Sequence, residues 1–196
     1  MDSEQPPLTS ANKGAQVVRE WVTVLVVALV IAVTVRSLVL QQFYISGPSM
    51  ESTMYQDNRV LVNKLSYRLH DIHRGDVVVF DRVTVDGEIV QHDDLIKRVI
   101  ALAGETISIK DCQVFIDGKL LEESYLNEYD LSQSALEDKC RVPIMDDLVV
   151  PENQLFVMGD NRPQSFDSRM FGPIEQSLVV GRAFVIIWPF SAAKFL

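Results

Sequence analysis

The sequence predicts a mainly β protein, in which a single N-terminal transmembrane helix precedes an antiparallel β domain built as a barrel or a folded sheet. Residues 21–40 form an apolar run that contains one charge, Arg36. Beyond this run, apolar and polar side chains alternate in short stretches rich in Val, Ile and Phe, which is typical of β-strands. Two Asp-Gly pairs, at residues 86–87 and 117–118, lie between such stretches and predict hairpin turns. The chain lacks the alternation of strands and helices that builds parallel sheets.

The apolar run has the length and character of a membrane anchor. Twenty residues of helix extend about 30 Å, which matches the hydrocarbon core of a bilayer. A buried helix of a soluble protein normally keeps one polar face, and this run has none over four turns. No Ala-x-Ala-like site follows it, so we expect an uncleaved anchor rather than a secretory signal. Lys13 and Arg19 precede the run and favour a cytoplasmic N-terminus, with Arg36 as the nearby competitor. The expected organisation is a polar cytoplasmic tail (1–20), an anchor (21–40) and an extracytoplasmic β domain (41–196).

The composition excludes several classes of function. The chain has 196 residues, and its 27 acidic side chains outnumber 18 basic ones to give a formal net charge of −9. An acidic chain without a basic run is a poor partner for phosphate backbones, so we expect no nucleic-acid binding. Two cysteines are too few for a disulfide scaffold, a four-thiolate zinc site or an iron–sulfur cluster. We expect no cofactor.

The outer domain contains six clear strand patterns and one interruption. Residues 119–142 break the pattern, and we interpret them as an excursion with one short helix. Cys112 and Cys140 flank this excursion and are either disulfide-bonded or two separate thiols; we favour the disulfide. The predicted strands are residues 59–63, 76–80, 95–101, 106–110, 113–116 and 154–158.

Ser49 follows a segment of restricted backbone conformation shortly after the anchor. Pro48 restricts its own φ and disfavours helix at Gly47, which limits the conformations available before Ser49. Only nine residues separate Ser49 from the end of the apolar run, so we expect Ser49 to lie close to the membrane surface. The alternative is a plain linker turn, because Gly-Pro-Ser is common in loops.

A lysine falls within an apolar strand pattern. In a strand, Lys97 shares a face with Leu95 and Val99. Burial disfavours the charged form and lowers the pKa of a lysine, and a neutral amine is a usable general base. The alternative is a solvated lysine that protects a sheet edge from aggregation.

The segment 158–169 is unusually dense in hydrogen-bonding side chains. It follows an apolar strand and contains Asp160, Arg162, Ser165, Asp167 and Arg169. Such a loop either only holds its own shape or orients a neighbouring catalytic group.

The three histidines do not form a second site by sequence. His70 and His73 are an isolated pair with no cysteine or well-spaced third ligand, and His92 stands apart. We therefore expect no zinc site. A Ser-His-Asp triad is compatible with any sequence order, but we interpret all three histidines as surface residues.

Taken together, these segments resemble the bacterial type I signal peptidases, membrane-anchored Ser–Lys endopeptidases, and in particular the smaller Gram-positive-type members. The motifs occur in the family's order along most of the chain. They are the Gly47-Pro48-Ser49-Met50 segment, residues 74–80 (RGDVVVF), residues 97–105 (KRVIALAGE), residues 159–169 (GDNRPQSFDSR) and the closing residues 181–183 and 188–189.

The resemblance implies a role for each candidate residue. Ser49 corresponds to the nucleophile, Lys97 to the general base, and Ser165 to the hydroxyl that orients the lysine amine. Gly47 and Ser49 form the turn that supplies oxyanion donors. The remaining implied residues are the structural ion pairs Arg98–Asp160 and Asp167–Arg169, the substrate-pocket residues Ile45, Met50 and Ile96, and a small variable lobe at residues 111–150.

The resemblance also implies partners and leaves two rival functions. The implied partners are secretory preproteins with small residues before the cleavage site, together with the lipid bilayer, with no metal. A catalytically silent, membrane-tethered β module would keep the fold without turnover. A Ser–Lys autoprotease of the stress-repressor type would carry a DNA-binding domain where this chain has an apolar segment.

Two positions depart from the family pattern. Most members have Pro-Thr two and three residues after the motif methionine, whereas this chain has Ser52 and Thr53. We therefore expect a looser turn after the nucleophile. Gram-negative members place a serine two residues before the nucleophile, where this chain has Gly47. The Ser49 N–H must then contribute more of the oxyanion binding, because each such donor is worth about 10²–10³ in rate.

Overall fold

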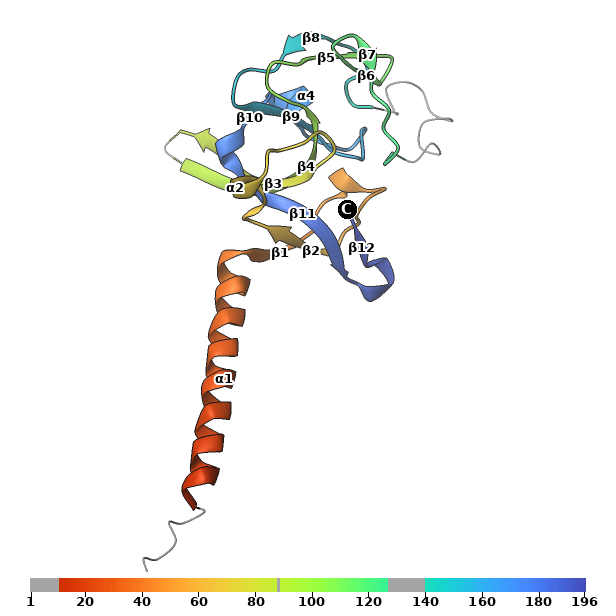
Figure 1. Cartoon of the computed structure of the whole chain (residues 1–196). Helices are drawn as coiled ribbons and strands as arrows, with labels where there is room; N and C mark the ends of the chain where they lie inside the picture. The colour runs from red at the N-terminus through yellow and green to blue at the C-terminus, as the bar shows by residue number, and fades with distance from the viewer. Residues whose placement is uncertain (1–10, 88, 127–139) are drawn as a thin grey trace, which may run out of the picture. The chain divides into compact units, whose positions relative to one another are not determined.

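The computed structural model describes residues 11–87, 89–126 and 140–196, and the chain divides into two compact units, Met1–Val39 and Leu40–Leu196. The first unit contains the helix α1, Ala11–Leu38, drawn in red to orange in Figure 1. Within it, Gly14–Thr34 is long and apolar enough to cross a membrane, and none of its hydrophobic stretch is buried against the rest of the chain.

The helix begins ten residues earlier than the apolar run. Residues 11–20 were expected to belong to a polar tail, yet they include Ala, Lys, Gln, Arg and Glu, which are good helix formers. A helix already stabilised by the apolar run extends readily into such residues, because each added residue gains a hydrogen bond without a new nucleation step. Residues 1–10 and the side chain of Arg36 lie outside the described part.

The second unit is built on two antiparallel sheets, as the alternating pattern predicted. The larger one has eight strands in the order β1-β2-β11-β3-β4-β9-β10, with β12 paired to β11. Its first and last strands do not pair with each other in the described residues, so the sheet is folded rather than closed into a barrel. Its strands are β1 (Leu40–Tyr44), β2 (Arg59–Asn63), β3 (Val77–Asp86), β4 (Ile89–Ala101), β9 (Gln154–Met158), β10 (Ile174–Glu175), β11 (Val179–Trp188) and β12 (Lys194–Phe195).

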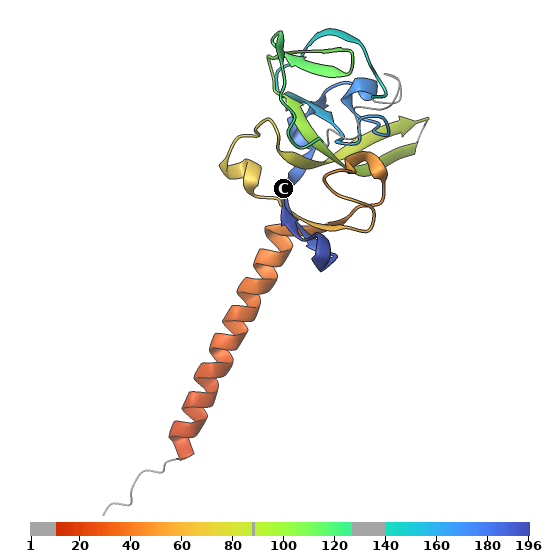
Figure 2. The same cartoon turned by 90° about the vertical axis from the view of Figure 1, so that its right-hand side faces the viewer.

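The smaller sheet has four strands in the order β7-β6-β5-β8. Figures 1 and 2 both show it at the end of this unit away from β1 and β12. Of the excursion at residues 119–142, in which one short helix was expected, residues 127–139 lie outside the described residues. The strands are β5 (Thr106–Lys110), β6 (Gln113–Ile116), β7 (Lys119–Leu120) and β8 (Met145–Val149).

Short helical turns complete the second unit. The one that matters for the site, η1, is a single 3-10 turn between β1 and β2. The five turns are η1 (Pro48–Met50), α2 (Ser66–Leu69), α4 (Ser168–Phe171), η3 (Gln176–Leu178) and η4 (Phe190–Ala192).

The hairpin of β3 and β4 is longer than its sequence pattern indicated. The two strands have 10 and 13 residues and pair without a break from Val77↔Arg98 to Asp86↔Ile89. The outer half pairs polar residues such as Asp81↔Asp94 and Thr84↔Gln91, and the predicted strand 76–80 ended before the Val83 and Val85 alternation that continues it. The Asp-Gly turn is where the sequence predicted it.

Strands β4 and β9 are buried on both faces, which explains their continuous apolar runs. Val99 and Val157 belong to one core cluster, whereas their neighbours Ile100 and Met158 belong to another. Because successive side chains of a strand point to opposite faces, both faces of this pair are covered. The site described below lies at this doubly buried part of the sheet.

Candidate active site

Ser49 lies on a turn that is fixed from both sides. Pro48 occupies the first helical position of η1, where its missing N–H costs no hydrogen bond, and Gly47 before it is extended (φ −139°, ψ 164°). Met50 after it is fully buried in the core of the larger sheet. Ser49 itself remains partly exposed, so a substrate can reach its hydroxyl.

The Lys97 amine lies against the Ser49 hydroxyl. Lys97 Nζ is 2.8 Å from Ser49 Oγ and also donates to the Ile96 carbonyl oxygen at 3.0 Å. The lysine comes from β4, and only 3% of it is exposed. The two groups that sequence placed 48 positions apart are thus within hydrogen-bond distance.

Burial changes the protonation of Lys97. It lowers the pKa of the amine to about 8; the nearby carboxylates of Asp167 and Asp160 act in the opposite direction, and Arg169 adds to the lowering. Near this pH a large fraction of the amine is neutral and can accept a proton. A lysine that is buried to this extent is not the solvated edge-strand lysine that the sequence left as the alternative.

Arg98, the next residue of β4, forms a buried ion pair with Asp160. Arg98 Nε and Nη2 bind the two Asp160 carboxylate oxygens at 2.9 and 2.7 Å. The Thr53 hydroxyl donates to Asp160 at 2.5 Å, and Arg98 Nη1 donates to the Gly75 carbonyl oxygen at 2.8 Å. This network ties β4 to the loop after η1 and to the loop before β3. Removing one partner would leave a buried charge unpaired, which is strongly destabilising.

Asp167 and Arg169 form the second predicted pair. Arg169 Nε and Nη2 bind Asp167 at 2.8 and 2.7 Å, and the Gly159 N–H donates to the same carboxylate at 2.9 Å. Although burial raises the pKa of Asp167, the Arg169 guanidinium and the Gly159 N–H outweigh it and leave the pKa below its ordinary value. The ionised carboxylate therefore holds the end of β9 in place.

Ser165 is fully buried beside the same strand end. Its hydroxyl lies beside the Asp167 carboxylate and helps to lower the pKa of that group, and no hydrogen bond joins it to Lys97 among the described residues. A Cβ on Gly159 would overlap both the Ser165 hydroxyl and the Ser49 carbonyl oxygen. Gly159 therefore allows the Ser165 and Ser49 segments to approach each other closely.

The turn at Gly47 and Ser49 is open to an incoming oxygen atom. No hydrogen bond from the Ser49 N–H occurs within the described part of the chain. Apart from Gly47 and its two chain neighbours, no atom of the described residues lies within 4 Å of the position that a Gly47 Cβ would occupy. The three residues expected to line a pocket differ in access: Ile45 and Met50 are buried in the core, whereas Ile96 is partly exposed and packs against it.

The turn after Ser49 has a defined geometry despite the missing proline. Glu51 (φ −57°, ψ 147°) and Ser52 (φ 89°) occupy the central positions of a type II turn, closed by a Thr53 N–H to Met50 carbonyl bond of 3.1 Å. Proline cannot adopt the φ of Ser52. The Ser52 hydroxyl is buried without a hydrogen-bond partner in the described residues.

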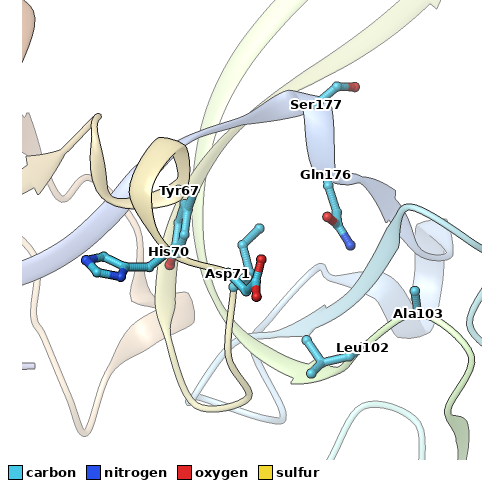
Figure 3. Close-up of a pocket in the computed structure, with 8 residues that line it drawn as sticks. Tyr67, His70, Asp71, Leu102, Ala103, Gln176 and Ser177 are labelled. Carbon is cyan, nitrogen blue, oxygen red and sulfur yellow. The ribbon is translucent and has the colours of Figure 1, made fainter.

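The histidines lie elsewhere. His92 Nδ1 is 2.6 Å from Asp81 on the β3–β4 hairpin, and His70 lines a separate cavity of about 460 Å³. Figure 3 shows that cavity between Tyr67, His70 and Asp71 on one side and Leu102, Ala103 and Gln176 on the other; neither Ser49 nor Lys97 lines it. Among the described residues, no group of three or more His, Cys, Asp or Glu is placed to hold a metal ion.

Several residues that contact the site were not singled out from the sequence. The Asn161 N–H donates to the Ser49 carbonyl oxygen at 3.1 Å, and Thr53 bridges Asp160 and Arg98. Glu123 and Tyr125 reach the site from the excursion at residues 119–142. Thr53 and Asn161 belong to the segments compared with the family but were given no role, and no local pattern marks Glu123 or Tyr125, because their partners lie far away in the sequence.

The cysteines that flank this excursion are bonded. The structure contains the Cys112–Cys140 disulfide, the option that the sequence analysis favoured.

Comparison with known proteins gives a consistent result. The family model described as signal peptidase, peptidase S26, matches residues 18–188. Signal peptidase I V of Bacillus subtilis (strain 168) is 39% identical over 166 residues, which cover 83% of this chain and 95% of that protein. Signal peptidase IB of Staphylococcus aureus (strain MRSA252) is 33% identical over 184 residues, which cover 90% of this chain and 92% of that protein.

A curated relative and a solved structure also match. A probable signal peptidase I-2 of Synechocystis is 34% identical over 184 residues, covering 92% of this chain and 79% of that protein. The crystal structure of a signal peptidase I from Enterococcus faecalis V583 is 31% identical, covers 58% of this chain and 97% of that chain, and has a TM-score of 0.44. The resemblance seen in the sequence motifs is confirmed: the chain belongs to the signal peptidase I enzymes of the peptidase S26 family, serine endopeptidases that remove signal peptides.

Proposed function

We propose that this chain is a membrane-anchored endopeptidase that removes signal peptides from secreted preproteins with Ser49 as nucleophile and Lys97 as general base. The observation that carries this proposal is the 2.8 Å distance between Lys97 Nζ and Ser49 Oγ, with the lysine 97% buried from solvent. A general base must lie within hydrogen-bond distance of the proton that it removes, and its pKa must be near the working pH.

The reaction follows from the two groups. Neutral Lys97 accepts the Ser49 proton while Ser49 Oγ attacks the scissile carbonyl carbon. The resulting tetrahedral intermediate collapses when the protonated lysine gives its proton to the leaving amine, and an acyl-enzyme remains. A water molecule, deprotonated by Lys97, then hydrolyses the ester and restores both groups.

The surrounding residues support this chemistry. We assign oxyanion binding to the Ser49 N–H and the open turn at Gly47, because preorganised donors stabilise the developing negative charge. We assign Ser165 to orienting the lysine amine, because its hydroxyl is buried close to the Ser49 backbone.

The ion pairs and the pocket complete the assignment. The pairs Arg98–Asp160 and Asp167–Arg169 brace the two segments that carry Lys97 and Ser165. We assign Ile45, Met50 and Ile96 to the small apolar pockets that select Ala-x-Ala-like residues before the cleaved bond. Of these, Ile96 is accessible directly.

We also propose the placement in the cell. The apolar part of α1 spans the membrane, the tail before it is cytoplasmic, and residues 41–196 are extracytoplasmic. The Cys112–Cys140 disulfide supports this orientation, because disulfides persist mainly in oxidising compartments. Anchor and signal peptide then share one bilayer, which restricts the search of enzyme for substrate to two dimensions.

The decisive experiment is cleavage of a preprotein with an Ala-x-Ala site by the full-length protein in detergent. We expect the unaltered protein to cut at that site, and Ser49→Ala and Lys97→Ala, each verified as folded, to be inactive. Binding without cutting by the unaltered protein would favour a silent binding module. Cutting that survives Lys97→Ala would contradict the assignment of the base.

A further inference from the structure

The segment that follows β7 contacts the loop 159–162, which comes after β9. Glu123 forms a two-pronged ion pair with Arg162: Arg162 Nη1 donates to Glu123 Oε2 at 2.8 Å, and Nη2 donates to Oε1. The two side chains are only 10% and 5% exposed. A buried, bidentate pair of this kind fixes the position of both partners, because breaking it leaves a charge unpaired in the interior.

Arg162 passes this constraint to the strand end beside the nucleophile. Its Nε donates to the Gly159 carbonyl oxygen at 3.1 Å, and its own carbonyl oxygen accepts from Arg169 Nη2 at 2.9 Å. The intervening Asn161 donates its N–H to the Ser49 carbonyl oxygen at 3.1 Å. The loop 159–162 is thus held by Glu123 on one side and contacts the Ser49 turn on the other.

Tyr125 links the same segment to the base. Its hydroxyl donates to Glu123 Oε1 at 2.5 Å, and its ring centroid lies 4.0 Å from the Arg98 guanidinium carbon. A guanidinium over an aromatic ring is attracted to it, and the attraction increases when water is excluded. Arg98 follows Lys97 on β4, so Tyr125 packs against the residue next to the proposed base.

We propose that Glu123 and Tyr125 are positioning residues for the Ser49–Lys97 dyad, holding the loop 159–162 and Arg98 in the arrangement in which Ser49 Oγ meets Lys97 Nζ. This inference rests on the proposed Ser–Lys mechanism and assigns part of it to the lobe at residues 111–150. The disulfide belongs to the same device, because Cys112 and Cys140 close the excursion that carries both residues.

Glu122 offers a matched control for substitutions of Glu123. Glu122 and Glu123 are adjacent, but Glu122 is exposed whereas Glu123 is paired and largely buried. Glu123→Gln and Glu122→Gln remove the same charge from neighbouring positions. Full-length protein in detergent, with an Ala-x-Ala preprotein as substrate, gives kcat and KM for each, and a melting curve gives the folded fraction.

We expect Glu123→Gln to lower kcat of the folded enzyme about tenfold with KM unchanged. A displaced loop misaligns the dyad but leaves the residues assigned to the substrate pocket in place. Glu122→Gln should match the unaltered protein. Tyr125→Phe keeps the ring over Arg98 and loses only the bond to Glu123, so we expect a smaller loss in kcat. Combining it with Glu123→Gln should lower kcat less than the product of the two separate effects, because Tyr125 and Arg162 both act through the same Glu123 side chain.

The outcomes separate the two proposals. If Glu123→Gln and Glu122→Gln have equal kcat, or if kcat falls only in proportion to the unfolded fraction, the positioning role is wrong while the dyad stands. If Lys97→Ala cuts as well as the unaltered protein, the dyad itself is wrong. If Glu123→Gln does not fold, Tyr125→Phe decides: a kcat equal to that of the unaltered protein would overturn the inference.

Discussion

At the scale of single residues, the chemistry depends on the environment of one lysine. An amine in water is almost fully protonated at neutral pH, with a pKa of about 10.4. Lys97 is buried, and this burial outweighs two nearby carboxylates and brings its pKa to about 8. The carboxylates matter because without them the desolvated amine would be still less basic. The balance gives the proposed base an amine that is partly neutral near pH 8 and still basic enough to accept a proton.

This balance predicts the pH dependence of cleavage. The active form is the neutral amine, so kcat/KM should increase about tenfold per pH unit below a pKa of about 8 and level off above it. Initial rates between pH 6 and 10 with a peptide that lacks titratable side chains would measure this. A rate that is constant from pH 6 to 8 would contradict a lysine base with this pKa.

Ser52 is a second residue of interest, because its backbone conformation affects the stability of the fold. Its φ of 89° strains a residue with a Cβ, and its hydroxyl is buried without a partner in the described residues. Ser52→Gly should raise the free energy of unfolding by about 1 kcal/mol, because it relieves strain that exceeds the entropy cost of glycine. Denaturant unfolding in detergent would measure this.

Two further substitutions test the cause. Ser52→Ala removes the hydroxyl but keeps the Cβ, so the difference between the glycine and alanine variants isolates the backbone contribution. Ser52→Pro, which restores the residue common in the family, should destabilise this chain because its φ is incompatible. A stabilising proline would show that the turn differs from the one described here.

At the scale of elements, the proposed mechanism requires η1, β4 and the loop after β9 to meet. Each supplies one part: η1 the Ser49 hydroxyl, β4 the Lys97 amine, and the loop the buried Ser165. Gly159 lies where the loop and η1 touch, and its missing side chain permits the contact. Buried ion pairs then hold the three elements, and their cost in desolvation is offset only while every partner is present.

Gly159→Ala tests this contact. The new Cβ would overlap the Ser49 carbonyl oxygen, so the loop must move and kcat should fall about 100-fold. Gly181→Ala is a suitable control, because its Cβ would lie 2.5 Å from the Asn63 carbonyl oxygen, at a strand contact outside the site. We expect both variants to melt at lower temperature, but only Gly159→Ala to have a reduced kcat in its folded fraction. Equal kcat values for the two variants would contradict the close-approach role.

At the scale of the whole molecule, the chain consists of an apolar helix and a separate β unit. The 157 residues from Leu40 to Leu196 contain all three core clusters and every proposed site residue. The apolar part of α1 is not buried within the chain, so its hydrophobic surface is available to lipid. The proposed chemistry and the proposed membrane attachment therefore belong to different units.

This division predicts the effect of removing residues 1–39. The remaining unit should cleave a short soluble peptide with kcat/KM unchanged, because it retains the dyad and its supports. On a preprotein inserted in vesicles its rate should fall about 100-fold, because enzyme and substrate no longer share a bilayer. Parallel assays of both substrates with the full chain provide the comparison. Equal loss on both substrates would show that the anchor supports the fold rather than the encounter.

The sequence by itself determined the class of this protein and most of its elements. The apolar run, the strands β2, β5, β6 and β9, the Asp-Gly turns and the ordered motifs around Ser49 and Lys97 are local patterns, and local patterns survive without a structure. They were sufficient to identify the family. The helix start at Ala11, the outer half of the β3–β4 hairpin and the strands β1, β8, β10 and β12 were not predicted, because short or largely polar stretches give only a weak periodic signal.

Only the tertiary structure decided how the site is arranged. Whether Lys97 is buried, whether Arg98 meets Asp160, and that Glu123 reaches Arg162 from the excursion all depend on contacts between residues 39 to 62 positions apart. A pKa shift or a buried ion pair is a property of the space around a group, and that space is built by distant segments. The identity of the residues is therefore readable from the chain, whereas their protonation and positioning are set by the fold.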